Sequence, residues 1–204
     1  MQIKHCLIIL IALPIFMASS CVKPVEKPRY KIPQEVKDFI MFPEGSYWVY
    51  QDSVSGAIDS HHLHSFILYE RDNNRDYYYE IFNQNLSRSF YNDTIYGGGA
   101  NNAEIGDVIV SKYHEISAQP YRDFLFFSPS EIGDIYSGEI EFSSAINDFT
   151  MNSKQYSDIK IFNSLAQKHP IQTKKIYFAK DVGIIKRVEY SGKVWELTDY
   201  QIVQ

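Results

Sequence analysis

The sequence predicts an all-β protein: a single curved antiparallel sheet or partly open barrel of about ten strands, with one short N-terminal helix. Two observations predict this class. Strand-forming residues are abundant, with 16 Tyr and 13 Phe among 204 residues. Apolar and polar residues also alternate at period two between short turn signals, as antiparallel strands with one covered face require. A sheet of this size curls or closes.

The chain begins with a segment typical of a secretory signal peptide. One base, Lys4, precedes an uncharged run over residues 6–17, and small residues follow this run. The run is shorter than the roughly 20 apolar residues that a membrane-spanning helix needs, and Pro14 interrupts it. A basic start, a short apolar stretch and small residues at its end together assign residues 1–20 to a signal peptide.

Cys21 follows this segment directly in the sequence ASSC, and it is the last cysteine of the chain. The motif resembles the lipobox of Gram-negative lipoproteins, with alanine where that family usually has leucine. The resemblance implies that Cys21 carries a lipid and is the membrane anchor. A soluble secreted protein with a free thiol at Cys21 is the alternative, although acylation would remove the oxidation liability of such a thiol. Val22, where some lipoproteins have aspartate, implies the outer membrane, with the protein facing either the periplasm or the surface.

Residues 21–33 are expected to form a tether between anchor and domain. Three prolines favour extended chain, and four bases accompany only one acid, Glu26. Twelve such residues reach roughly 37 Å. The basic strip suits an anionic membrane surface, and a plain solvated spacer is the alternative. Residues 33–42 are then expected to form the short helix that opens a single β-rich domain over residues 34–204.

This domain is acidic. The chain has 20 basic and 25 acidic residues, and five of the bases but only one acid precede residue 34, which leaves the domain with a net charge of −9. Nucleic acid is therefore not expected as a partner, because phosphate binding needs a basic face.

Strand-like segments bounded by turn residues fill the rest of the domain. They cover residues 46–54, 61–70, 76–82, 87–96, 107–114, 123–128, 138–143, 156–162, 174–179, 183–190 and 193–203. Short turns between several of them predict hairpins.

The first and last strands also carry a resemblance. YWVY in the opening strand and AKDVGIIKRVEY in the closing hairpin are similar to segments of Gram-negative outer-membrane lipoproteins of unknown function, and the resemblance implies no activity. In the closing hairpin, period two places Val188 and Tyr190 on the apolar face and Arg187 and Glu189 on the polar face.

A curved sheet with more aromatic residues than one face needs predicts an apolar or amphiphilic ligand inside the curve. The expected lining comprises Tyr77 and Tyr79, which share a strand face, and Ile184, Val188 and Trp195 of the closing hairpin. Exposed tyrosines could instead capture glycans, and docking on another envelope protein is a third possibility.

No catalytic residue, metal site or cofactor is predicted. The chain has no Gly-x-Ser-x-Gly elbow and no usable cysteine, so a non-enzymatic protein is expected. His62 and His64 share a strand face and could share a zinc ion, but no third ligand lies nearby in sequence, and a solvent-facing strand is expected. The glycine-rich residues 96–102 lack the Gly-Lys-Ser/Thr of a phosphate loop and are expected to form a mobile connection at the rim of the barrel.

Two tripeptides, DSV over residues 52–54 and DTI over residues 93–95, resemble short O-glycosylation sites of some Gram-negative lineages. The resemblance makes Ser53 and Thr94 the candidate acceptors. Taken together, these expectations describe an outer-membrane-anchored, non-enzymatic lipoprotein whose β domain binds an apolar or amphiphilic ligand.

Overall fold

The computed structural model describes residues 26–72, 77–89, 92–99, 108–114, 121–127, 131–167, 169 and 171–204. The predicted signal peptide, Cys21 and the first residues of the tether lie outside them. The described chain forms one short helix and thirteen strands. Their bounds are β1 Arg29–Tyr30, α2 Gln34–Ile40, β2 Tyr47–Asp52, β3 Ile58–Asp72, β4 Tyr78–Arg88, β5 Asn92–Gly99, β6 Val108–His114, β7 Tyr121–Phe127, β8 Ile135–Tyr136, β9 Ile140–Met151, β10 Lys154–Ser164, β11 Thr173–Ala179, β12 Gly183–Glu189 and β13 Val194–Gln201.

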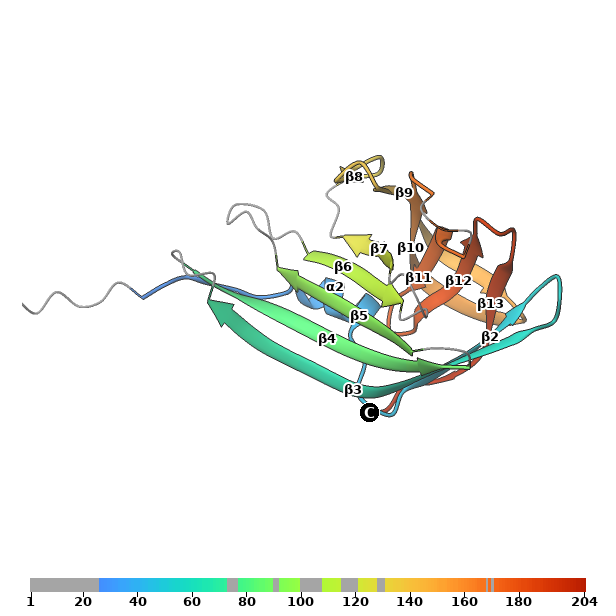
Figure 1. Cartoon of the computed structure of the whole chain (residues 1–204), viewed down its shortest axis with the longest axis horizontal. Helices are drawn as coiled ribbons and strands as arrows, with labels where there is room; N and C mark the ends of the chain where they lie inside the picture. Colours follow the sequence, from blue (N-terminus) through green and yellow to red (C-terminus); the bar gives the residue numbers. More distant parts are fainter. Residues whose placement is uncertain are drawn as a thin grey trace, which may run out of the picture.

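All strands belong to one sheet with the order β7-β6-β5-β4-β3-β2-β13-β12-β11-β10-β9-β8, and β1 pairs separately with β4. Neighbours along this order are antiparallel, whereas β1 and β4 are parallel. The first long strand, β2, and the last, β13, pair in the middle, so the sheet consists of an N-terminal half and a C-terminal half (Figure 1). The predicted all-β class, with one curved sheet and one short helix, is confirmed.

The sheet curls so that its two edge regions approach each other through side chains, and among the described strands no backbone pairing joins them. The ring of Phe126 on β7 lies 4.9 Å from that of Phe162 on β10 and 5.3 Å from that of Phe178 on β11. Helix α2 lies inside this curve, where Phe39 packs 6.0 Å from Phe126. The barrel is therefore open, and aromatic side chains and the helix fill the gap.

The helix follows from its sequence. Pro33 sits at the N-cap, where its missing N–H costs no helical hydrogen bond, and Val36, Phe39 and Ile40 form the buried stripe. These residues join a core cluster with phenylalanines from β4, β7, β9, β10 and β11. A second cluster gathers around Trp48 on β2 and comprises buried side chains from both halves of the sheet.

Two sequence expectations differ from the fold. Residues 27–33 are not a free spacer, because β1 pairs with β4 and Ile32 is buried in the core. The packed chain thus begins before residue 34. The expectation of a mobile connection is wrong for Tyr96–Gly99, since these residues form the end of β5 and pair with β4 and β6. Their backbone makes the ladder although glycine has no side chain to pack; residues 100–102 lie outside the described chain.

Candidate functional site

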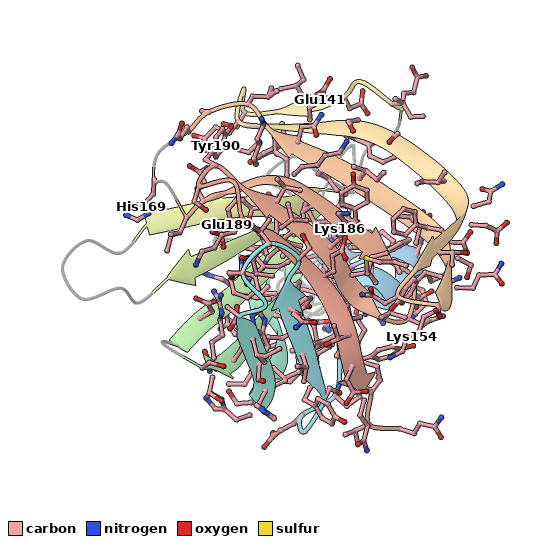
Figure 2. The ribbon with its side chains drawn as sticks, turned by 90° about the vertical axis from the view of Figure 1, so that its right-hand side faces the viewer. Glu141, Lys154, His169, Lys186, Glu189 and Tyr190 are labelled. Atoms are coloured by element: carbon pink, nitrogen blue, oxygen red, sulfur yellow. The ribbon has the colours of Figure 1, made fainter. Side chains whose placement is uncertain are left out.

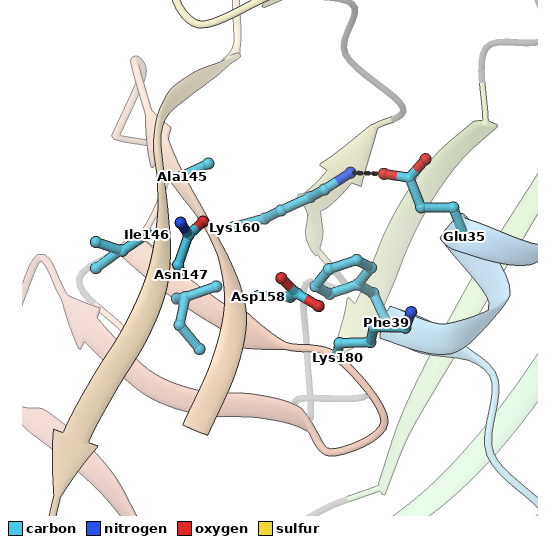
Figure 3. Close-up of a pocket in the computed structure, with 9 residues that line it drawn as sticks. Glu35, Phe39, Ala145, Ile146, Asn147, Asp158, Lys160 and Lys180 are labelled. Carbon is cyan, nitrogen blue, oxygen red and sulfur yellow. Dashed lines mark hydrogen bonds and ion pairs between the residues drawn. The ribbon is translucent and has the colours of Figure 1, made fainter. Parts of the chain in front are cut away.

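A groove of about 290 Å³ lies between helix α2 and the middle of the β9–β10 hairpin (Figure 3). The helix contributes one wall and the two strands contribute the other. The groove is lined by Glu35, Phe39, Ala145, Ile146, Asn147, Asp158, Ile159, Lys160 and Lys180. Its volume is close to the lower limit of roughly 300 Å³ for sites that bind small molecules.

The floor of the groove is apolar and its rim carries charges. Phe39 and Ile159 are almost fully buried, whereas Ile146 remains 37% exposed. The Lys160 Nζ lies 2.7 Å from Glu35 Oε1 and 5.0 Å from the centroid of the Phe39 ring. An apolar surface beneath an ammonium group is an arrangement suited to an amphiphilic molecule with an anionic head.

Two further features mark this groove. Lys180 lies 3.6 Å from Asp38 Oδ2 on the helix, a long contact for an ion pair. Asp158, within β10, has a φ of 50°, in the left-handed region that strand residues rarely adopt. Its carbonyl accepts a hydrogen bond from the Lys180 N–H. Such conformations cost free energy and are concentrated at ligand sites.

A second constellation, the interior ion cluster, lies on the concave side of the sheet. It comprises Asp59 on β3, His61 on β3, Arg88 on β4, Asp93 on β5 and Arg187 on β12. Asp59 accepts hydrogen bonds from both guanidinium groups and lies 3.0 Å from the His61 Nε2. Arg88 also binds Asp93 at 2.9 Å. Because β13 and β2 separate β12 from β3 in the sheet, Arg187 reaches across the curve and joins its two halves.

Burial sets the protonation states in this cluster. Burial works against the charge of Asp59, but hydrogen bonds and nearby positive charge outweigh it and hold the pKa of Asp59 well below its usual range. Burial lowers the pKa of His61 to about 3, Arg88 and Arg187 add to this effect, and Asp59 opposes it. His61 is therefore neutral and Asp59 ionised at pH 7, and the Asp59 carboxylate is shared by both guanidinium groups.

The interior beside this cluster holds little free space. A cavity of about 40 Å³ is lined by Phe42, Trp48, Tyr50, His61, Gln84, Leu86, Ile95 and Ile184. Such a volume accommodates one or two water molecules. An acyl chain does not fit in a cavity of this size.

The predicted lining residues have different positions. Ile184 lines the small interior cavity, and Trp195 is buried, with its indole N–H donating to Glu189 at 2.8 Å. The alternation predicted for the closing hairpin is wrong on β12, because Arg187 and Glu189 are buried and Val188 lies on the opposite face. Val188 therefore does not line the interior, and Lys186 on its face appears at the surface in Figure 2. The partners of Arg187 and Glu189 offset the cost of burying them.

Tyr77 and Tyr79 lie together as predicted, with ring centroids 6.2 Å apart, but far from the closing hairpin. They belong to the projecting end of the β3–β4 hairpin.

The candidate modification and metal residues occupy ordinary positions. Ser53 is exposed in the turn after β2, whereas Thr94 is half-buried and donates to Asn85 at 3.0 Å. His62 and His64 are both exposed. Within the described ranges, no group of three or more His, Cys, Asp or Glu is placed to hold a metal ion.

The sequence offered one unused signal for the interior ion cluster. On β3, period two places Asp59 and His61 on the same strand face as buried Leu63. On β12, it places Arg187 on the same face as buried Ile185. Charged residues on the core-facing side of several strands indicate that they pair with one another in the interior. The groove left no such signal, because its walls come from segments that are more than 100 residues apart.

Comparison with protein-family models, with curated proteins and with solved structures finds no match for this chain. Among the residues that the structure describes, no helix combines the length and the apolar character that a membrane crossing requires.

Proposed function

We propose that this chain is a lipid-anchored outer-membrane protein without enzymatic activity, and that its β domain binds the polar end of an amphiphilic ligand in the groove between α2 and β9–β10. The observation that carries the proposal is the groove itself, which combines a buried apolar floor with two lysines. Its volume suits a head group and a few carbons, so the remainder of a longer chain would leave the groove.

Lys160 is the residue that would take the anionic group. Its partner Glu35 is 69% exposed, and an ion pair at the surface contributes only about 0–1 kcal/mol. A phosphate or carboxylate can therefore replace Glu35 at small cost, while the Phe39 ring keeps the ammonium group in place. The domain as a whole is acidic and repels anions, so binding requires this local pair of lysines.

The test uses the mature chain with Cys21→Ala, titrated with dodecyl phosphate and followed by its melting temperature. A ligand that binds the folded state stabilises it by about 2.7 kcal/mol at one hundred times its Kd. Lys160→Met should abolish the rise. Lys186→Met is the matched control, because Lys186 also forms an ion pair of 2.7 Å, with Glu196, at similar side-chain exposure.

An equal rise in both variants would exclude Lys160 as the head-group ligand. No rise in the parent protein with alkyl phosphates, fatty acids or neutral detergents would reject the amphiphile proposal and favour glycan binding or docking on an envelope protein. The anchor is tested separately: Cys21→Ala should move the protein from the membrane fraction to the soluble fraction, and retention of the variant after a salt wash would contradict lipid anchoring through Cys21.

A further inference from the structure

The end of the β3–β4 hairpin projects beyond the packed body of the protein (Figure 1). From Ile67 to Arg71 every residue of β3 is exposed, although strand pairing with β4 continues to Asp72. We call this projecting part the arm. The β3 side chains of this stretch are exposed on both faces and are available to another surface, although the opposite β4 residues Ile81 and Phe82 are fully buried.

Residues 27–30, the described part of the chain that follows Cys21, lie along this arm. β1 pairs in parallel with the start of β4, and the Tyr78 N–H donates to the Pro28 carbonyl at 2.9 Å. Lys27 lies 2.8 Å from Asp72. Since β1 and β4 are parallel, the chain traced backwards from β1 runs toward the outer end of the arm.

This course shortens the tether. Only five residue steps separate Glu26 from Cys21, and an extended chain of that length spans at most about 18 Å. A lipid on Cys21 would therefore hold the end of the arm close to the bilayer, whereas a free tether of twelve residues would allow roughly twice that distance.

The outer face of the arm has the side chains of a membrane interface. Ile67 is 53% and Tyr69 40% exposed, and period two places both on one face. Tyr79 lies on the same face as these two residues. The centroid of the Tyr77 ring is 6.2 Å from that of Tyr79 and 5.3 Å from that of Tyr30. Tyrosine is favoured where one end of a side chain is apolar and the other wet, as at membrane–water interfaces.

We propose that this arm patch, formed by Tyr30, Ile67, Tyr69, Tyr77 and Tyr79, lies in the head-group region of the bilayer to which Cys21 is attached. The inference rests on the proposed lipid anchor. Lys27 and Arg29 are already paired with Asp72 and Glu70, so apolar and aromatic side chains supply most of the contact. The exposed Arg71 lies on the same face as Ile67 and Tyr69 and would add an electrostatic part. High salt should therefore weaken the contact only in part.

The test places a tryptophan in the arm patch. Tyr69→Trp adds an exposed indole, whereas Trp48 and Trp195 are each only 5% exposed. Ile132→Trp is the control, at an apolar position that is 62% exposed in the turn before β8, a strand that lies above the packed body in Figure 1 and apart from the arm. The full mature protein is attached through Cys21 to vesicles of phosphatidylethanolamine and phosphatidylglycerol that contain brominated lipid.

Brominated lipid should quench the tryptophan fluorescence of Tyr69→Trp well beyond that of the parent protein. The double variant Ile67→Ser/Tyr69→Trp should show less quenching than Tyr69→Trp alone. Ile132→Trp should behave as the parent does. Quenching of Tyr69→Trp no greater than that of the parent would overturn the inference, as would equal quenching at position 132.

Mass spectrometry of the protein purified from its membrane distinguishes the two proposals. An acyl mass on Cys21 supports the anchor, and its absence rejects the anchor. In that case the free thiol is coupled to a maleimide-bearing lipid, and the same quenching measurement still decides whether the arm patch enters the interface.

Discussion

Acid should destabilise this protein through a single buried imidazole, that of His61. Burial and two neighbouring arginines lower its pKa from 6.5 to about 3 in the folded state. Between pH 6.5 and pH 3, His61 is therefore protonated in the unfolded chain but neutral in the folded protein. The stability linked to His61 is fully present above pH 6.5 and is lost as the pH falls toward 3, at about 1.4 kcal/mol per pH unit. Between pH 7.5 and pH 4.5 the loss amounts to about 3 kcal/mol.

The assay is urea unfolding of the mature Cys21→Ala chain at a series of pH values. Carboxylates also titrate below pH 5, so the informative quantity is the difference between the parent and His61→Gln. Between pH 7.5 and pH 4.5, the free energy of unfolding of the variant should fall by about 3 kcal/mol less than that of the parent, whatever the stability of the variant at pH 7.5. His62→Gln, one residue away on the exposed face, should keep the full dependence.

Identical pH profiles for the parent and His61→Gln would falsify the electrostatic reasoning. They would mean that water reaches His61 or that the imidazole leaves the cluster before it is protonated. A change in the denaturant m value with pH would separate such local opening from global unfolding.

Two further substitutions test the packing. Asp59→Asn leaves Arg88 and Arg187 buried without their shared carboxylate, and we expect a loss of about 3–5 kcal/mol in the free energy of unfolding by urea titration. Gly183→Ala places a Cβ 2.9 Å from the Phe42 ring at a φ of 92°, whereas Gly192→Ala has a similar φ of 88° with no atom within 4 Å. In both variants the free energy of unfolding should fall by about 1–2 kcal/mol because of backbone strain, and in Gly183→Ala by about 1–3 kcal/mol more because of the clash. Thermal unfolding measures both losses. Equal losses in the two variants would show that Phe42 moves aside freely.

The strands themselves could be predicted from sequence because their signal is local. Each of the eleven expected segments overlaps a strand of the structure, and the helix lies within its expected residues. Turn residues and β-branched or aromatic runs are properties of neighbours in the chain. The two strands that the sequence did not suggest, β1 and β8, are two residues long and depend on partners elsewhere.

The facing of side chains could not be predicted as well, because it depends on partners from distant strands. Arg187 and Glu189 looked like a polar face, yet they are buried at 3% and 6% exposure. The rule that charges face water fails where another buried charge or an indole N–H is within reach. The groove could not be predicted at all, since Glu35 and Lys160 meet only when α2 has entered the curve.

The interior ion cluster also has a consequence for strand register. A slip of one residue in β3 would turn Asp59 to the outer face and carry a neighbouring side chain inward. Arg88 and Arg187 would then remain buried without their shared carboxylate, at a cost of several kcal/mol. An apolar side chain in place of Asp59 would tolerate such a slip far better, because one aliphatic residue can substitute for the next. Among the described strands, the two halves of the sheet share backbone pairing only where β2 meets β13, and the cluster adds a side-chain link from β12 to β3 across the curve. The cluster therefore destabilises a misaligned strand register by more than it stabilises the native register.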